Sequence, residues 1–338
     1  MPSLRQDPAT RKWSIIATER AMRPDDFADD AGDAARIEAY DKSCPFCNGN
    51  EHMTPEPTLI IPARGGSGAW ALRVVPNKFA ALSKPSSDSA STARIRNGMY
   101  LEMDGVGEHE VVIEVPDHSK TIATMTEEEV SRVIATYKTR FLELDRSPWN
   151  QQIIIFRNRG EGAGTSLAHP HSQIIGTPIV PEDIRSRLEV AQRYYDDYGT
   201  CLYCDMLQAE IKEKVRIVAS NSGFVAFTPF ASTVPYNIWI VPRRHASSFG
   251  VITGDEADLL GSVLRSVLLR MHALLGNPDY NYVIRSAPHH SAGEPHFHWY
   301  LEILPRLTTQ AGFEIGSGMN INVVVPEDAA LQLREAAK

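Results

Sequence analysis

The sequence has few cysteines, with only four among 338 residues. Four are too few for a disulfide-built scaffold of this length, and we expect them to be reduced thiols in a cytoplasmic protein. No stretch approaches the roughly 18 consecutive apolar residues that a membrane span requires. The polar start MPSLRQDPATRKW also has no apolar signal core. The sequence therefore predicts a cytoplasmic protein with no membrane association.

The sequence also has no excess of basic residues, because its 34 Lys and Arg are outnumbered by 42 Asp and Glu, which gives a net charge of −8. Nucleic-acid binding generally needs a basic face, so nucleic acid is not an expected partner. The pattern GxxxxGK[ST] does not occur, which excludes a Walker P-loop. A small anionic ligand is still compatible with this charge, because local N–H donors can outweigh the overall field.

Cysteines and histidines form one pattern that occurs twice in the chain: Cys-x-x-Cys, then a lone His, then His-x-His. The interval from His118 to His169 equals that from His245 to His296. Zinc prefers four tetrahedral nitrogen and sulfur ligands, and a site with four protein ligands is structural. We predict a first structural zinc bound by Cys44, Cys47, His118 and His169. We predict a second bound by Cys201, Cys204, His245 and His296, with iron at this second site and a redox role for a cysteine pair as alternatives.

Similar secondary structure surrounds the two copies. Helical spacing with capping signals predicts helices over 126–145, 181–198 and 253–275. Alternating or β-branched segments predict strands over 72–75, 110–115, 152–157, 172–175, 224–228, 237–241, 280–285 and 297–304. We therefore predict an α+β fold of two tandem domains, residues 1–198 and 199–338, each a mostly antiparallel sheet with packed helices.

The His-Pro-His segment of the first copy is a candidate catalytic strand. Residues i and i+2 of a strand face the same way, so His171 should lie beside the metal ligand His169, about 6–7 Å along the strand. Neutral imidazole has a lone pair near pH 7, which makes His171 a nucleophile that needs no separate base. Glycines alternate just upstream in RNRGEGAGTS, where backbone N–H groups can approach a phosphate closely. Gln173, on the face of His171, could donate an amide N–H to a phosphoryl oxygen.

These residues resemble those of the galactose-1-phosphate uridylyltransferases of the histidine-triad superfamily. The anchors are DPATRKWSIIATERAMRP, CPFC, VPNKFAAL, VPDHSKT and GxGTSxAHPHSQ. The second CxxC and the closing GFEIGSG, NIN and PED are similar to the related ADP-glucose phosphorylase branch. The resemblance implies two tandem histidine-triad-like domains with half-barrel sheets, a homodimer, and a second half that closes the site and binds the sugar.

The same resemblance implies a ping-pong nucleotidyltransferase. His171 would attack the α-phosphorus of a nucleotide-sugar, release hexose 1-phosphate and form a nucleotidyl-histidine that Gln173 steadies. The ligand contacts that the resemblance implies come from Arg23, Asn77, Asn158, Gly164, Thr165, Ser166 and Phe313. In the run that holds the sugar in that family, Lys, Tyr and Glu stand where this chain has Gly312, Ser317 and Gly318, so the sugar is left open.

We expect a UDP-glucose:hexose-1-phosphate uridylyltransferase acting on galactose 1-phosphate. The alternative is an ADP-sugar phosphorylase with inorganic phosphate as acceptor. Two other classes compete: a zinc hydrolase in which His171 is a ligand and water attacks, and a zinc-stabilised binding module without catalysis. The glycine run next to an unliganded His171 argues against the binding module, which has no need of that imidazole.

Overall fold

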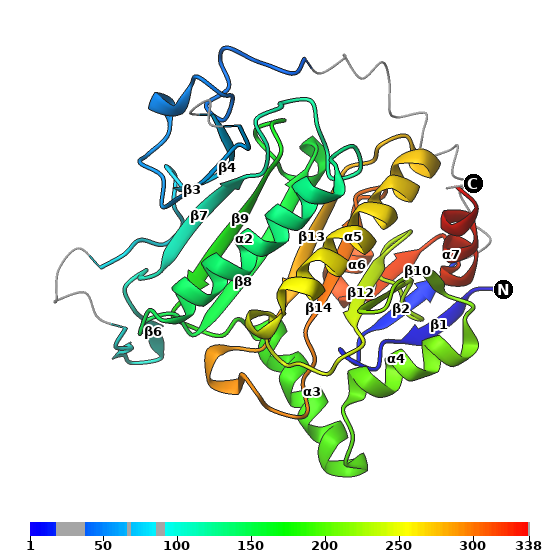
Figure 1. Ribbon diagram of the computed structural model, residues 1–338. Coiled ribbons are helices and arrows are strands. Elements are labelled where there is room, and N and C mark those ends of the chain that lie inside the picture. Colours follow the sequence, from blue (N-terminus) through cyan, green and yellow to red (C-terminus); the bar gives the residue numbers. More distant parts are fainter. Residues whose placement is uncertain (18–37, 66–68, 86–91, 337–338) are drawn as a thin grey trace.

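A single ten-stranded antiparallel sheet forms the centre of the protein (Figure 1). The structure, a computed structural model, describes residues 1–17, 38–65, 69–85 and 92–336. From edge to edge, the strands are β10 (Ile217–Ser220), β11 (Phe224–Phe227), β12 (Ile238–Pro242), β14 (Tyr300–Pro305), β13 (Tyr280–Arg285), β8 (Gln152–Arg159), β9 (His171–Thr177), β7 (Glu108–Ile113), β4 (Trp70–Pro76) and β3 (Leu59–Pro62). The predicted α+β class and the predicted strands are confirmed.

Two long helices, α2 (Glu127–Asp145) and α5 (Gly254–Leu275), lie side by side across one face of the sheet (Figure 1). Both begin with a capping box, as predicted: Thr126 and Thr253 each accept the backbone N–H of a Glu three residues later, whose carboxylate bonds back. Gly261 lets the helices approach closely, because a Cβ there would lie 3.1 Å from the backbone nitrogen of Ser131. Their apolar faces and the sheet enclose the main core.

The two halves of the chain share this sheet instead of forming two separate ones. Strand β8 of the first half pairs with β13 of the second, with Phe156 opposite Val283. Each half alone would leave the N–H and C=O groups of one strand edge unpaired, and pairing the two edges satisfies them. The metal-bearing ends of both halves thereby become parts of one rigid layer.

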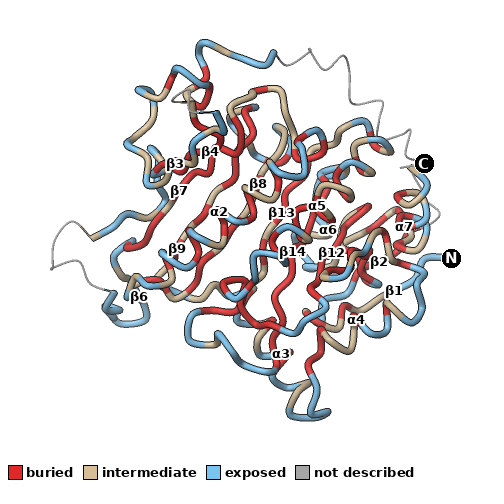
Figure 2. The backbone as a smooth tube through the Cα atoms, in the orientation of Figure 1, coloured by how far each residue is buried: buried red, intermediate tan, exposed pale blue. Residues whose placement is uncertain are grey.

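The opposite face of the sheet is covered unevenly. Helices α3 (Glu182–Tyr198) and α4 (Leu202–Glu213) cover it in the second half, where they belong to a second apolar cluster. A small cluster around Phe46 and Trp70 covers it near β4 and β7. Between these covers, alternate side chains of β8, β9 and β13 are only partly buried (Figure 2), among them Phe156, Gln173 and Val283. This open part of the face carries the candidate site.

The two ends of the chain meet on the second half. Strands β1 (Ser3–Gln6) and β2 (Trp13–Ile16) form a small sheet with β15 (Asn320–Asn322). Arg5 pairs with Glu327 of α7 (Pro326–Glu335) at 2.9 Å. Residues 1–17 therefore pack against the second half of the chain.

The remaining elements are β5 (Ile95–Asn97), β6 (Tyr100–Glu102), α6 (Gly312–Ser317) and 3₁₀ turns at Glu51–Met53, Glu161–Ala163, Phe249–Val251 and His289–Ser291. The division at residues 198 and 199 stays a prediction, and it falls where Gly199 ends α3.

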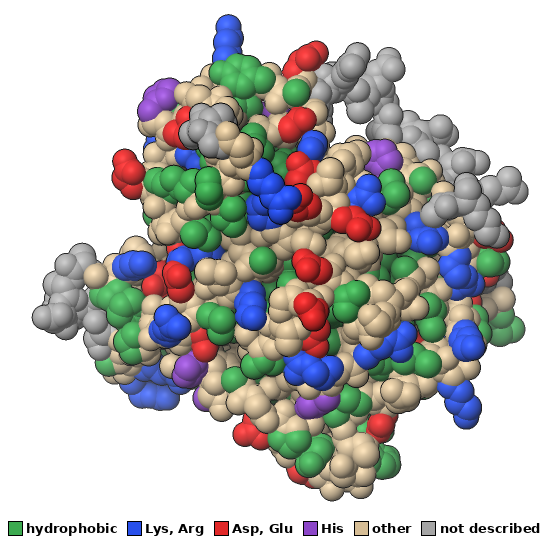
Figure 3. Space-filling view, viewed as in Figure 1, with side chains coloured by type: hydrophobic (Ala, Val, Ile, Leu, Met, Phe, Trp, Pro, Cys, Tyr) green, Lys and Arg blue, Asp and Glu red, His purple; other side chains and the backbone are tan. Residues whose placement is uncertain are grey.

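The surface over α2 and α5 carries interspersed Lys, Arg, Asp and Glu side chains (Figure 3). Within the described ranges, no helix combines the length and apolar character needed to cross a bilayer.

Candidate active site and metal centres

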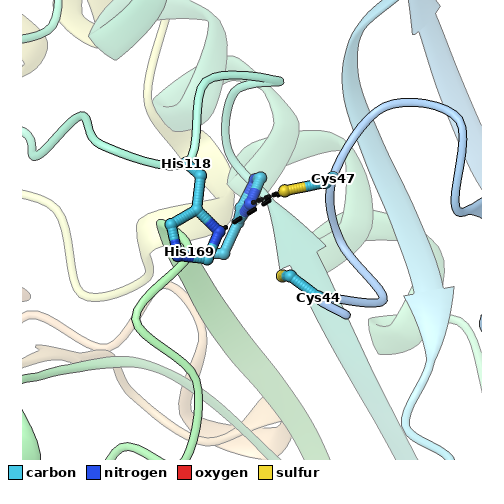
Figure 4. Close-up of side chains that lie close together, drawn as sticks. All are labelled: Cys44, Cys47, His118 and His169. Carbon is cyan, nitrogen blue, oxygen red and sulfur yellow. Dashed lines mark hydrogen bonds between the residues drawn. The ribbon is translucent and has the colours of Figure 1, made fainter. Parts of the chain in front are cut away.

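The four predicted ligands of the first zinc converge from three distant segments (Figure 4). Cys44 and Cys47 lie in one loop, His118 follows β7 and His169 precedes β9. Their ligand atoms all lie within 4.8 Å of one another, and all four residues are buried. Cys47 Sγ is 3.4 Å from His118 Nδ1 and 3.6 Å from His169 Nδ1. Tetrahedral zinc with ordinary bond lengths would separate sulfur and nitrogen ligands by about 3.5 Å, so the group fits zinc.

The surroundings of this first group also suit a cation. The Nε2–H of His169 donates to the carbonyl of Val115 at 2.8 Å, which leaves Nδ1 as the ligand atom. Burial raises the pKa of the Cys44 thiol to about 11, because a thiolate in an apolar setting needs a neighbouring positive charge. Burial likewise lowers the pKa of His169 to about 4, so its imidazole is neutral and able to act as a ligand. A bound divalent ion would supply the charge that stabilises both thiolates.

The second group of ligands contains His298, which corrects the prediction of His296. Cys201, Cys204, His245 and His298 have ligand atoms within 4.8 Å of one another. Cys204 Sγ lies 3.3 Å from His245 Nδ1 and 3.4 Å from His298 Nδ1. His296 Nδ1 instead lies 3.8 Å from a carboxylate oxygen of Glu294. Two thiolates with two imidazoles favour zinc among the common ions.

The error in the prediction comes from the loop that precedes β14. In both halves the ligand His stands two residues before the strand: His169 before His171 of β9, and His298 before Tyr300 of β14. Residues 286–299 link β13 to β14, a longer connection than residues 160–170 between β8 and β9. An alignment by equal intervals from the lone His therefore pairs His169 with His296, whereas the structure pairs His169 with His298.

The corrected alignment makes Tyr300 the counterpart of His171, and Glu302 the counterpart of Gln173. Tyr300 is fully buried, and its hydroxyl accepts a hydrogen bond from Arg187 of α3 at 2.7 Å. Burial raises the pKa of Tyr300 above its usual value, so the phenol stays protonated. The second half therefore has a metal group but no nucleophile at the matching position.

The corrected ligand predicts opposite effects for the two histidines of that segment. His298→Ala should reduce bound zinc from two ions to one per chain, because it removes a buried ligand. His296→Ala, the matched control two residues away, should keep both ions. Elemental analysis of the purified variants measures this directly. Loss of zinc from His296→Ala together with retention in His298→Ala would contradict the geometry.

The second cysteine pair differs from the first in its setting. Cys201 is the N-cap of α4 and Cys204 lies in its first turn, where the helix dipole also suits a redox pair. Two imidazoles within 3.4 Å of Cys204 Sγ distinguish it from a free dithiol. The group is also less enclosed, since Cys204 is half-buried and His245 is exposed. The sequence prediction missed α4, because CLYC is followed by few capping signals.

His171 presents one nitrogen to the open part of the sheet. Its Nδ1 lies 2.8 Å from the carbonyl oxygen of His169, and a carbonyl can only accept, so Nδ1 carries the hydrogen and Nε2 the lone pair. Phe46 packs edge-on against the ring with centroids 5.3 Å apart. Burial lowers the pKa of His171, which keeps the ring neutral. No hydrogen bond holds Nε2 among the residues that the structure describes, so the free lone pair is available to an electrophile.

The glycine loop wraps around a carboxylate that the sequence did not point to. Gly160 has a φ of 82°, and a Cβ there would collide with Asp279. The N–H of Gly162 donates to Asp279 Oδ2 at 2.7 Å, so one predicted phosphate donor is already engaged. Thr165 and Ser166 line a cavity of about 570 Å³ that His118 and Arg157 also border.

The other predicted contacts fall in different places. Asn158 accepts a hydrogen bond from Asn281 of β13 at 2.7 Å, across the junction of the two halves. Phe313 lies on α6 and is 48% exposed, with no ring contact to His171 among the described residues. Arg23 lies outside the described residues. Gln173 is hydrogen-bonded to His109, a residue that the sequence analysis did not single out.

The sequence and structure match known proteins over nearly the whole chain. Residues 1–181 and 187–338 match the family models described as the N-terminal and C-terminal domains of galactose-1-phosphate uridyl transferase. The chain is 35% identical to ADP-glucose phosphorylase of Arabidopsis thaliana, covering 99% of this chain and 93% of that protein. It is 27% identical to galactose-1-phosphate uridylyltransferase of Thermotoga maritima, covering 99% and 98%. The crystal structure of the Arabidopsis enzyme with bound ADP-glucose superposes with a TM-score of 0.83 at 34% identity, covering 99% and 98%.

Proposed function

The chain belongs to the galactose-1-phosphate uridyl transferase family, and we propose that it is an ADP-sugar phosphorylase, which transfers an adenylyl group to inorganic phosphate. It is a nucleotidyltransferase of that family. The sequence alone favoured a uridylyltransferase, with the phosphorylase as the alternative. The 35% identity to an ADP-glucose phosphorylase gives the alternative the better support. The second Cys2His2 group, which resembles that branch, supports it as well.

The orientation of His171 is the observation that carries the proposed chemistry. The lone pair of Nε2 attacks the α-phosphorus of the ADP-sugar while Nδ1–H stays bonded to the His169 carbonyl. An N–P bond forms, the bond to the bridging oxygen breaks, and hexose 1-phosphate leaves with that electron pair. An oxygen of inorganic phosphate then attacks the same phosphorus, the N–P bond breaks, and ADP leaves with His171 neutral again. No general base is needed, because the attacking imidazole carries no proton on Nε2.

The remaining groups orient the substrate and stabilise charge, which is most of what phosphoryl-type transfer requires of a protein. Gln173 donates to the transferred phosphoryl group, and the residues of the loop 160–166 approach the phosphates. Asn77 and Asn158 are proposed nucleotide contacts, and Phe313 a sugar contact. Both metal ions are structural, since each group already supplies four protein ligands. A homodimer and a cytoplasmic location stay predictions.

A uridylyltransferase acting on UDP-glucose and a hexose 1-phosphate is the second candidate. The observation that favours it is the 27% identity to the Thermotoga enzyme over 99% of this chain. Both candidates use the same nucleotidyl-histidine, so they differ only in the base and the acceptor.

Trapping the covalent intermediate should separate the candidates. With ADP-glucose labelled at the α-phosphate and no acceptor, we expect about one acid-labile, alkali-stable label per chain. Added inorganic phosphate should release the label as ADP. UDP-glucose should label the protein at least about tenfold more slowly, because a pocket shaped for adenine leaves polar groups unpaired with uracil.

The reverse preference, with release by galactose 1-phosphate, would favour the second candidate. Hydrolysis of the sugar nucleotide without any labelled protein would instead indicate the zinc hydrolase.

A further inference from the structure

Three side chains form a hydrogen-bonded cluster beside the nucleophile strand. Gln173 of β9 places its Oε1 2.7 Å from His109 Nε2, on the adjacent strand β7. Asn77, which follows β4, places its Nδ2 3.4 Å from the same oxygen and 3.0 Å from His109 Nε2. All three are partly buried, and none of them belongs to a metal group.

Backbone N–H groups of one short segment determine which atoms of this cluster can donate. The N–H of Ala81 donates to His109 Nδ1 at 3.2 Å, so in the neutral ring the hydrogen must be on Nε2. The N–H of Phe79 donates to Asn77 Oδ1 at 2.9 Å, so Asn77 turns its amide hydrogens the other way. The Nε2–H of His109 is therefore the close donor to the oxygen of Gln173, and the amide of Asn77, which lies nearer to His109 Nε2 than to this oxygen, is a longer second contact. The motif VPNKFAAL thus acquires a physical role, since its backbone fixes both orientations.

We propose that His109 is a positioning residue of the transfer reaction: it holds the oxygen of Gln173 so that the amide NH₂ group faces the phosphoryl group on His171. This inference rests on the proposed function. It assigns His109 no contact with the substrate, because the imidazole is occupied on one side by Ala81 and on the other by Gln173.

The need for such a residue follows from the symmetry of an amide. The terminal torsion of glutamine has two nearly equivalent settings, which exchange the oxygen and the nitrogen. With the oxygen facing the substrate, its lone pairs would repel an anionic phosphoryl oxygen. With the nitrogen facing it, an N–H stabilises the developing charge. The His109 donor on Oε1, with Asn77 Nδ2 as a longer second contact, selects the second setting before substrate binds.

The same sheet geometry makes the cluster rigid. His109 and Gln173 sit diagonally across the antiparallel pair, since His109 is opposite Ile175 and Gln173 is opposite Val111. The backbone N–H of Asn77 donates to the His109 carbonyl at 2.8 Å. Burial lowers the pKa of His109, so the ring is neutral and its Nδ1 can accept from Ala81.

Two amide substitutions at position 109 test whether the N–H donor at Nε2, and not another part of the imidazole, is required. His109→Gln can place an N–H near the former Nε2, whereas His109→Asn is shorter and reaches only the former Nδ1. In single-turnover labelling with ADP-glucose, His109→Asn should form the labelled enzyme about tenfold or more slowly. His109→Gln should stay within about threefold of wild type. The KM for ADP-glucose should change less than about twofold in both, because the lost orientation acts mainly in the transition state.

A double-mutant cycle with Gln173→Ala gives the decisive readout. If His109 acts through Gln173, His109→Asn should cause no further loss in the Gln173→Ala background. Equal loss in both backgrounds, or a wild-type rate for His109→Asn, would overturn the inference. A misfolded His109→Asn would show as a lower melting temperature. In that case His109→Gln decides, because a labelling rate about tenfold or more below wild type in this variant would also overturn the inference. Absence of labelled wild-type enzyme would instead refute the proposed function, so the two failures are distinguishable.

Discussion

Replacing His171 with alanine should abolish nucleotidyl transfer and leave the metal content unchanged. The rate of labelling should fall by at least about 10⁴-fold, because no other described side chain offers a lone pair at that position and the intermediate cannot form. Both Cys2His2 groups lack His171, so two zinc ions per chain should remain. Rapid-quench labelling and elemental analysis on the same preparation measure both quantities.

The matched control for this substitution is Ser172→Ala. Ser172 is the next residue of β9 and points to the helix-covered face, where it is 1% exposed. Its loss should leave transfer near the wild-type rate. Loss of a zinc ion from His171→Ala would support the hydrolase, in which this imidazole is a ligand. Residual transfer above about 1% would mean that another group is the nucleophile.

Local signals in the sequence were sufficient for much of this site. The helices that begin at Thr126 and Thr253 depend on capping and on apolar spacing within one segment, and both lie where predicted. The first metal group was predictable because cysteine and histidine have few other reasons to recur in that order. His171 and Gln173 lie on one face of β9, as the period of a strand predicts, whereas His169 lies two residues before that strand.

Features that depend on loop length or on pairing between halves were not predictable in this way. The assignment of His296 assumed that two loops have equal length, and the longer connection before β14 places His298 in the group. The pairing of β8 with β13 joins segments more than 100 residues apart, and no local pattern encodes it. His109 lies just before the predicted strand 110–115, and nothing in the local sequence singled it out. Only the register of β7 and β9 places it against Gln173.

Removing a thiolate from the first metal group should destabilise the first half of the chain strongly. Cys44 and Cys47 belong to a small apolar cluster that packs on β4 and β7, on the face of the sheet opposite the main core. A cluster of this size buries little surface, so the metal should hold the loop 41–50 against the segments of His118 and His169. Cys44→Ser should therefore lower the free energy of unfolding by on the order of 5 kcal/mol and reduce zinc to one ion per chain.

Loss of the first metal ion should also disturb the nucleophile His171, so stability and activity should decrease together. Phe46, between the two cysteines, contacts the rings of His169 and His171 at centroid distances of 6.0 and 5.3 Å. Without the metal, His169 is free to turn and the carbonyl that fixes His171 Nδ1 is no longer held. Thermal melts, zinc content and labelling rate should therefore fall together in Cys44→Ser. They should stay near wild type in Ser43→Ala, because the exposed hydroxyl of Ser43 donates to Asp41 and is no part of the metal group. Coincident melts of Cys44→Ser and wild type would show that this group contributes nothing to folding.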